Sequence, residues 1–300
     1  MILSFASPAF LTALNLRSVG IGFATNCIVV IGMAMVIICG GIDLSVGSVL
    51  CLSCALSGSL FYNGMPMPWA SAAGIAASIL CGVFCGFLIS YHNMPPFIVT
   101  MAMMSIARGV AYILTTGTSI SLINKLPPGF KFVGSGSIGP IPFIVLICAV
   151  VGLIADILFR KLPLLRLVYY VGSNERAAAF SGITVRKVKL YVYIISALLA
   201  GLAGQLFLSR FSYATPVAGN GLELIMIAGC VIGGVSMEGG EGTVLGSILG
   251  IVMLSLINNA LILLNVSVYW QQFVSGCILI TAVWLDFYRV RRANRKLNQG

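Results

Sequence analysis

The chain of 300 residues is 59% hydrophobic and 8% charged, with a formal net charge of +10 and a mean hydropathy of +1.08. This composition excludes an ordinary soluble domain, because the sequence repeats apolar runs of about 20 residues, the length that a helix needs to cross the hydrocarbon layer of a bilayer. We therefore predict an all-α, polytopic transmembrane bundle.

Nine apolar runs are candidate spans. In chain order they cover residues 20–41, 44–62, 69–91, 96–116, 140–159, 190–209, 222–236, 244–264 and 268–287. The run at 222–236 is short enough to be a half-helix or a re-entrant segment. Prolines fall at the edges of the runs, where they interrupt no helix.

Basic residues are concentrated in two segments. The connection 160–189 and the tail from residue 289 carry 12 of the 17 basic residues, and the positive-inside rule places both in the cytoplasm. Counting spans from these segments places the loop 117–139 outside and Asp43 inside. The same count places the N-terminus outside although "MILSFASPAF" is no signal peptide, so we expect that a preceding span is missing, of which "MILSF" is the remainder.

The nine cysteines lie within apolar runs and are expected to pack as small buried side chains. Cys51 and Cys54 form a C-x-x-C pair, but the chain has one histidine and no second pair, so a metal site lacks ligands.

Arg108 lies about the middle of its predicted span. A charge at this depth costs about 2.5–3.5 kcal/mol on insertion scales, which makes it a functional candidate. We leave two alternatives open: Arg108 faces an aqueous cavity, or it bonds to carbonyl groups at a broken helix. The roles of Gln205, Asn258 and Asn259 are left open in the same way, because such side chains either form hydrogen bonds between helices or contact the substrate.

Asp156 and Asp286 lie near predicted inner span ends. Interfacial ion pairs with Arg160 and Arg289 are their simplest interpretation.

Asp43 stands in "GGIDLSVGS" between the first two predicted spans. The charge count places it at a cytoplasmic turn, where its insertion cost is small. We expect its carboxylate to accept a hydrogen bond from the amide of Ser45 or Val46 and so cap the next helix.

The glycine-rich stretch "GGVSMEGGEGTVLG" at 233–246 is no phosphate-binding loop, because Thr243 and Val244 follow Gly242 where such a loop requires Lys and then Ser or Thr. It predicts a tight reversal between two spans. Glycines at 82 and 86, and at 242, 246 and 250, have the spacing that places small residues on one helix face for close packing.

The cytoplasmic stretch "VGSNERAAAFSGI" has its own helix signals. Ser173 is the expected cap, Glu175 favours the first turn, and Gly182 ends the helix. A helix of about eight residues, about 12 Å long, is too short to span and predicts a docking element. A helix lying on lipid is disfavoured by its thin apolar face.

Five stretches in order resemble the permease subunits of bacterial ABC importers for ribose and related monosaccharides. They are "GGIDLSVGSVL" at 40–50, "MPPFIVTMAMMSIARG" at 94–109, "GSNERAAAFSGI" at 172–183, "ELIMIAGCVIGGVSMEGGEGTVLG" at 223–246 and "YWQQFVSGCILITAVWLD" at 269–286. The resemblance covers almost the whole chain and implies one permease domain over 1–300, in a family that usually has ten spans. Met226 departs from the family pattern, in which an acidic residue is common.

The resemblance also implies partners and location. They are a second permease subunit (identical or a paralogue), ATP-binding subunits, and a periplasmic sugar-binding protein, at the bacterial inner membrane. The chain itself would bind no cofactor, metal or nucleic acid and would be no enzyme, since ATP belongs to the partner subunit.

Two groups of site residues follow. The stretch that matches the family's ATPase-coupling helix supplies Gly172, Asn174, Glu175, Ala178 and Gly182. The translocation pathway or gate is predicted to include Asp43, Ser45, Arg108 and Asn258, with capping and gate positioning favoured over sugar contact for Asp43.

Two other function classes remain to be distinguished. An ion-coupled secondary sugar transporter would need a buried carboxylate for its ion, and these are almost absent from the apolar runs. A membrane-embedded enzyme lacks a hydrolytic motif such as H-E-x-x-H or G-x-S-x-G. The sugar itself is left open.

Overall fold

The computed structural model describes residues 10–297, apart from the side chains of residues 164, 268, 272 and 289–297. The "MILSF" segment and the expected pairing of Asp286 with Arg289 therefore lie outside the described part.

Each of the nine predicted runs contains a helix. The helices are α2 (Ala13–Ile38), α3 (Val46–Tyr62), α4 (Met67–Tyr91), α5 (Pro96–Thr115), α7 (Phe143–Lys161), α10 (Val185–Phe211), α11 (Leu222–Ile232), α12 (Val244–Leu263) and α13 (Val268–Leu297). Among the described residues, six are long and apolar enough to cross a membrane, and α3 and α11 are shorter apolar helices. The predicted polytopic helical bundle is confirmed.

Smaller elements lie between these helices. They are α6 (Pro128–Ser135), α8 (Pro163–Ser173), α9 (Glu175–Phe180), and four two-residue strands, β1 (Ile120–Ser121), β2 (Ser137–Ile138), β3 (Ile141–Pro142) and β4 (Tyr213–Ala214). The strands pair antiparallel, β1 with β4 and β2 with β3.

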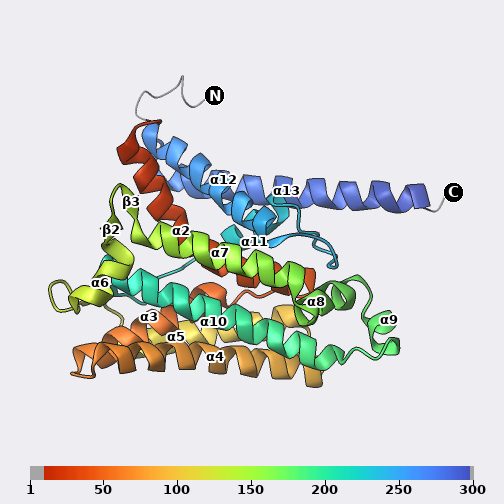
Figure 1. Ribbon diagram of the computed structural model, residues 1–300, viewed down its shortest axis with the longest axis horizontal. Helices are drawn as coiled ribbons and strands as arrows, with labels where there is room; N and C mark the ends of the chain where they lie inside the picture. Colours follow the sequence, from red (N-terminus) through yellow and green to blue (C-terminus); the bar gives the residue numbers. More distant parts are fainter. Residues whose placement is uncertain (1–9, 298–300) are drawn as a thin grey trace.

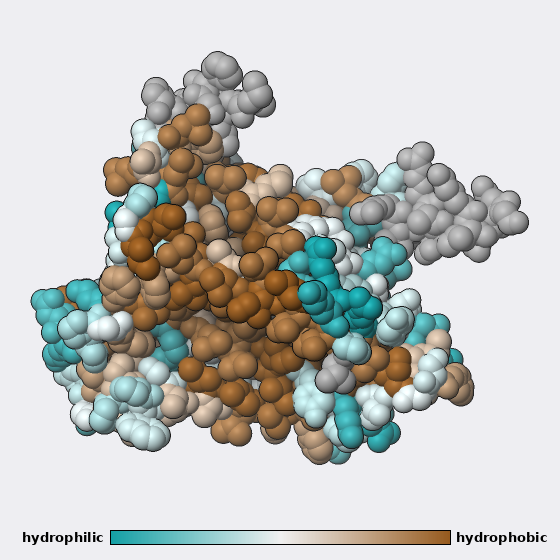
Figure 2. All heavy atoms as spheres, in the orientation of Figure 1, coloured by the Kyte–Doolittle hydropathy of each residue, from teal (hydrophilic) through white to brown (hydrophobic). Residues whose placement is uncertain are grey.

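The bundle has two polar ends and an apolar middle. In Figure 1 most helices run across the view, with α6, β2 and β3 at the left end and α8 and α9 at the right. Figure 2 shows a hydrophobic band between hydrophilic surfaces at these two ends. The grouping agrees with the predicted sides, so the end with α8 and α9 is called the inner end and the opposite end the outer end.

Helices α2 and α10 form the centre of the bundle. The most apolar stretches of α2 and α10 are 78% and 67% buried, against 28–33% for α4, α5, α7 and α12. Small residues permit this packing as predicted: a Cβ atom built on Gly82 would lie 2.6 Å from the Cβ of Ala197, and one on Gly86 2.9 Å from Leu190 Cδ1.

Gly246 and Gly250 of α12 likewise lie against the backbone of Gly233 and Gly229. Gly242 does not share their helix face, because it lies before α12 with a φ of +136°. The expected reversal at 233–246 is confirmed by positive φ angles at Gly234, Gly239 and Gly240.

Two chain segments interrupt the helices within the bundle. We call residues 39–45, between α2 and α3, the first break, and residues 212–221, between α10 and α11, the second break. The second break meets the first turn of α3, directly after the first break, because a Cβ on Gly219 would lie 2.8 Å from the Gly47 carbonyl oxygen.

From this meeting point α3 runs to the outer end, where Lys125 lies over the ring of Tyr62. Helix α11 runs to the inner end and has 11 residues, about 16 Å. It is therefore the half-helix that the short run at 222–236 predicts.

Candidate functional site

The short helix α9 begins at a cap that differs from the predicted one. The Asn174 side chain accepts a hydrogen bond from the Ala177 amide at 2.9 Å, and Asn174 has extended backbone angles. Ser173 is the last residue of α8, so the expectation that it caps was wrong. An asparagine after an interrupted helix satisfies the same free amide.

Helix α9 also ends as expected but is shorter. Gly182 has a φ of +83°, and the amides of Gly182 and Ile183 bond to the carbonyls of Ala179 and Ala178 at 3.0 and 3.1 Å. Its six residues lie at the inner end (Figure 1). Glu175 forms an ion pair with Lys189 at 2.6 Å, which ties α9 to the start of α10.

The faces of α9 differ in exposure. Ala178 is buried, with 5% of its surface exposed, whereas Phe180 is 92% exposed. An exposed aromatic side chain beside a short capped helix offers an anchor for a protein partner.

Glycine backbones connect α8 to the start of the first break and to the loop after α11 at the inner end. A Cβ on Gly172 would overlap the Ile38 carbonyl oxygen and lie 2.7 Å from the Gly240 amide nitrogen. That amide donates to the Ile38 carbonyl at 2.8 Å, and Gly239 lies against Gly40. We call Ile38, Gly40, Gly172, Gly239 and Gly240 the glycine junction.

Asp43 lies deeper than the charge count suggested. Its Oδ1 accepts from the Ser45 amide at 2.9 Å and from the Ser45 hydroxyl at 2.6 Å, which confirms the expected backbone contact. Its Oδ2 accepts from Ser196, the twelfth residue of α10, at 3.1 Å. Asp43 is 3% exposed, which corrects the prediction that it lies at a surface turn with a small insertion cost.

The carbonyl groups of the second break are satisfied by side chains of α3 and α5. The thiol of Cys51 donates to the carbonyls of Thr215 and Pro216 at 3.5 and 3.2 Å, and Cys54 donates to Tyr213 at 3.6 Å. Irregular backbone within a bilayer needs such partners, because no lipid group can replace them. The C-x-x-C pair thus holds a backbone segment.

Arg108 supplies the stronger contacts to the same segment. One terminal nitrogen donates to the carbonyls of Pro216 and Ala218 at 2.9 and 2.6 Å, and its Nε donates to Ser48 at 3.2 Å. Of the two alternatives raised by the sequence, the bonding to carbonyls at a broken helix is present.

Glu223 was missed by the sequence reasoning. Its carboxylate lies against the first turn of α3, since a Cβ on Gly47 would be 2.8 Å from Oε2. The available signal was an acidic residue in the first turn of a run already suspected to be re-entrant.

The three amide side chains behave differently. Gln205 donates to Ser53 and Ser57 of α3 at 2.7 and 2.9 Å, and Asn259 exchanges hydrogen bonds with Asn15 of α2, so these two join helices. Asn258 lines a cavity of about 570 Å³ beside the start of α11, together with Asn220 and Gln271. Among the described residues, no hydrogen bond joins Asn258 to Asp43, Ser45 or Arg108, so these predicted pathway residues do not form one cluster.

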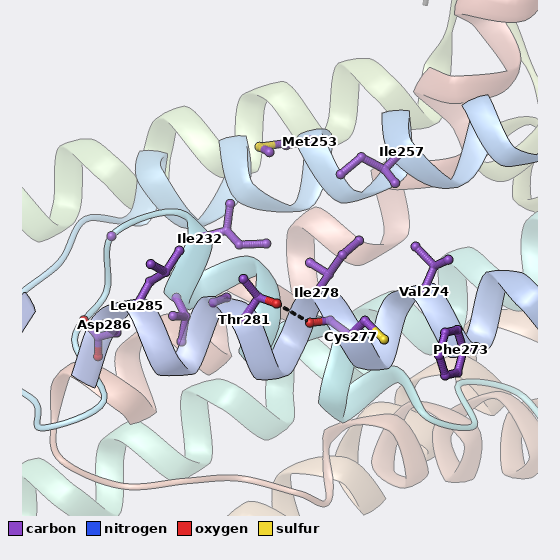
Figure 3. Close-up of a pocket in the computed structure, with 13 residues that line it drawn as sticks. Ile232, Met253, Ile257, Phe273, Val274, Cys277, Ile278, Thr281, Leu285 and Asp286 are labelled. Atoms are coloured by element: carbon purple, nitrogen blue, oxygen red, sulfur yellow. Dashed lines mark hydrogen bonds between the residues drawn. The ribbon is translucent and has the colours of Figure 1, made fainter. Parts of the chain in front are cut away.

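A second cavity, of about 650 Å³, lies between α11, α12 and α13 (Figure 3). It is lined by apolar side chains such as Ile232, Met253, Phe273 and Ile278. The hydroxyl of Thr281 donates to the Cys277 carbonyl at 2.8 Å. Apart from Thr281 and Asp286, the residues that line this cavity are mostly apolar.

Asp156 forms the expected ion pair with Arg160 at 2.8 Å. Asp286 accepts from the Met237 amide at 3.2 Å. All nine cysteines are free, and Cys277 alone among them is exposed.

Comparison with known proteins identifies the family. Residues 16–283 match the family model for the permease component of branched-chain amino acid transport systems. The chain is 38% identical to the ribose import permease protein of Bacillus subtilis (95% of this chain, 88% of the relative). It is 37% identical to the ribose import permease protein of Escherichia coli K12 (95% and 89%) and 32% to the L-arabinose ABC transporter permease protein of Azospirillum brasilense (96% and 84%). No solved structure matches the chain. This chain, a multi-pass membrane protein, therefore belongs to the family of ABC transporter permease components.

Proposed function

We propose that this chain is the membrane-spanning subunit of an ATP-driven importer for a monosaccharide or a sugar-like small molecule. A periplasmic binding protein delivers the substrate, and separate subunits bind and hydrolyse ATP at the cytoplasmic face of the bacterial inner membrane. The permease itself is no enzyme and binds no nucleotide. It works with a second permease subunit, either an identical copy or a paralogue.

The observation that carries the proposal is the connection from α9, through α8 and the glycine junction, to the first break and to the loop after α11. Helix α9 lies at the inner end with Phe180 exposed, and α8 before it contributes Gly172 to the glycine junction. Relatives of the chain include a ribose import permease, an L-arabinose ABC transporter permease and a D-allose transport system permease.

This connection supports a path for mechanical coupling. A displacement of α9 by the ATPase moves Gly172 against the Ile38 carbonyl, which immediately precedes the first break. The same displacement moves the loop at Gly239 and Gly240, which follows α11. Because packed backbone transmits small shifts without absorbing them, both breaks respond together and alternate access to the centre.

A charge reversal at Glu175 tests the coupling. Glu175→Lys places a cation beside Lys189, so we expect α9 to separate from α10 and both sugar uptake and its stimulated ATP hydrolysis to fall. The permease should still insert, as checked by membrane fractionation. Lys187→Glu, at an exposed position on α10, is the control and should retain uptake. Unchanged uptake by Glu175→Lys would contradict the coupling assignment.

Ala178 is less suitable for this test. Because it is buried, a bulky residue at this position disturbs the packing of α9 whether or not a partner docks there.

The carboxylate of Glu223 favours one other candidate, an ion-coupled secondary transporter. Two measurements separate the proposals: whether an ATP-binding subunit co-purifies with the chain, and whether uptake survives collapse of the proton and sodium gradients. An importer of the proposed class passes both.

A further inference from the structure

Two charged side chains lie half-buried at the middle depth of the bundle. Arg108 is the thirteenth of the 20 residues of α5, and Glu223 is in the first turn of α11, directly after the second break. Charges at this depth do not face lipid, because hydrocarbon offers them neither water nor partners. The exposed parts of both side chains therefore face a polar space.

The two side chains converge on one turn of α3. Arg108 donates to Ser48 at 3.2 Å, and the Glu223 carboxylate lies against the adjacent Gly47. The two side chains do not form an ion pair within 4 Å, since the two ion pairs of the described residues are Asp156 with Arg160 and Glu175 with Lys189.

The position of Arg108 is set by the second break. The carbonyls of Pro216 and Ala218 hold one terminal nitrogen, and these carbonyls belong to the segment that leads directly into α11 and Glu223. A shift of the second break thus moves both groups together. The guanidinium carries five N–H groups, and the three hydrogen bonds described do not use all of them.

We propose that Glu223 and Arg108 form a contact point for the hydroxyl groups of a neutral polyhydroxylated ligand as it crosses the membrane. The carboxylate accepts hydrogen bonds from ligand hydroxyls, and the free N–H groups of the guanidinium donate to ligand oxygens. The opposite charges balance, so the site selects no ion and suits a neutral sugar. Partial exposure keeps the contact weak enough for the ligand to leave. This inference rests on the proposed function.

Uptake measurements test the contact. The permease is reconstituted into proteoliposomes with its ATP-binding subunit and binding protein, and D-ribose, L-arabinose and D-allose serve as probes. Glu223→Gln keeps the size of the side chain but removes the charge, and we expect it to lower sugar uptake per ATP hydrolysed about tenfold. Glu223→Asp, which keeps the charge, should recover part of the loss. Glu241→Gln, the same change at an exposed position of the inner loop, should have no effect.

These measurements distinguish a failure of the proposed function from a failure of the proposed sugar contact. If no ATP-binding subunit co-purifies with the unmodified chain, the proposed function fails. If the subunit co-purifies and Glu223→Gln transports a probe sugar as efficiently as the unmodified complex, the contact is overturned.

Thiol labelling tests the polar space without transport. In a Cys277→Ala background, which removes the exposed native thiol, Glu223→Cys should react with a membrane-impermeant thiol reagent in one vesicle orientation. Protection of that residue from the reagent in both orientations would overturn the inference even if none of the three probes is carried.

Discussion

The α9 region and the two breaks are both irregular parts of a helical bundle, but they are held in different ways. Helix α9 is held by contacts between residues close in sequence: the capping bond of Asn174 spans three residues, and the ion pair of Glu175 with Lys189 spans 14. The breaks depend on hydrogen bonds between residues far apart in sequence. Arg108 donates to the Pro216 carbonyl 108 residues away, and Ser196 donates to Asp43 across 153 residues. Local contacts leave α9 able to move as a unit, whereas long-range contacts make the breaks part of the core.

The glycine junction is where the two kinds of region meet, and the largest effect is expected there. In Gly172→Val the new side chain overlaps the Ile38 carbonyl, and backbone atoms on both sides cannot move away. We expect a loss of more than about 3 kcal/mol of stability and no uptake, measured by detergent-solubilised thermal unfolding and by transport. Gly22→Ala, with open space at its Cβ, is the matched control. A stable, active Gly172→Val protein would remove the junction from the coupling path.

The next effect separates the breaks from α9. Arg108→Met leaves the Ala218 carbonyl without its donor and the Pro216 carbonyl with the Cys51 thiol alone, and an unpaired buried group costs about 1–3 kcal/mol. Denaturant unfolding should therefore show a loss of about 2 kcal/mol, with α9 still protected in hydrogen exchange. Arg186→Met, at an exposed arginine of α10, should change stability little. Equal stability of both variants would mean that the second break does not need Arg108.

A smaller change concerns the α9 cap. Asn174→Ala removes the acceptor for the Ala177 amide and should cost about 1 kcal/mol, confined to α9. Hydrogen exchange should rise at α9 while the midpoint of global unfolding stays unchanged. Asn174→Asp preserves the acceptor and should restore protection. If Asn174→Ala lowers global stability instead, α9 belongs to the core and the comparison fails.

The smallest effect is expected for the ion pair. The side chain of Glu175 is 54% exposed, so Glu175→Gln should cost at most about 1 kcal/mol, and less at high salt. Hydrogen exchange of α9 at low and high ionic strength measures it. A large, salt-independent loss would show that the pair does more than hold α9 against α10.

Much of the fold could be predicted from local patterns. The nine runs, the half-helix at 222–236 and the glycine reversal at 233–246 follow from hydropathy and turn chemistry, which act over a few residues. The α9 boundaries were less accurate, because Ser173 and Asn174 are both good caps and the packing of α8 decided between them.

The positions of the polar residues of the candidate site were harder to predict from the sequence. Asp43 was correctly paired with the Ser45 amide but placed too near the surface, since its depth depends on Ser196 of α10. Glu223 was overlooked because nothing in its neighbourhood reveals that the first turn of α3 approaches it.

The sequence by itself determined that this chain is a multi-span helical membrane protein with a capped helix on its inner side, because apolar length, basic loops and capping residues act locally. Only the tertiary structure decided which groups hold the breaks, where Asp43 and Glu223 lie, and that Gly172 joins α8 to the first break and to the loop after α11. Buried polar groups and close backbone contacts take their meaning from their partners, and here those partners lie many helices away along the chain.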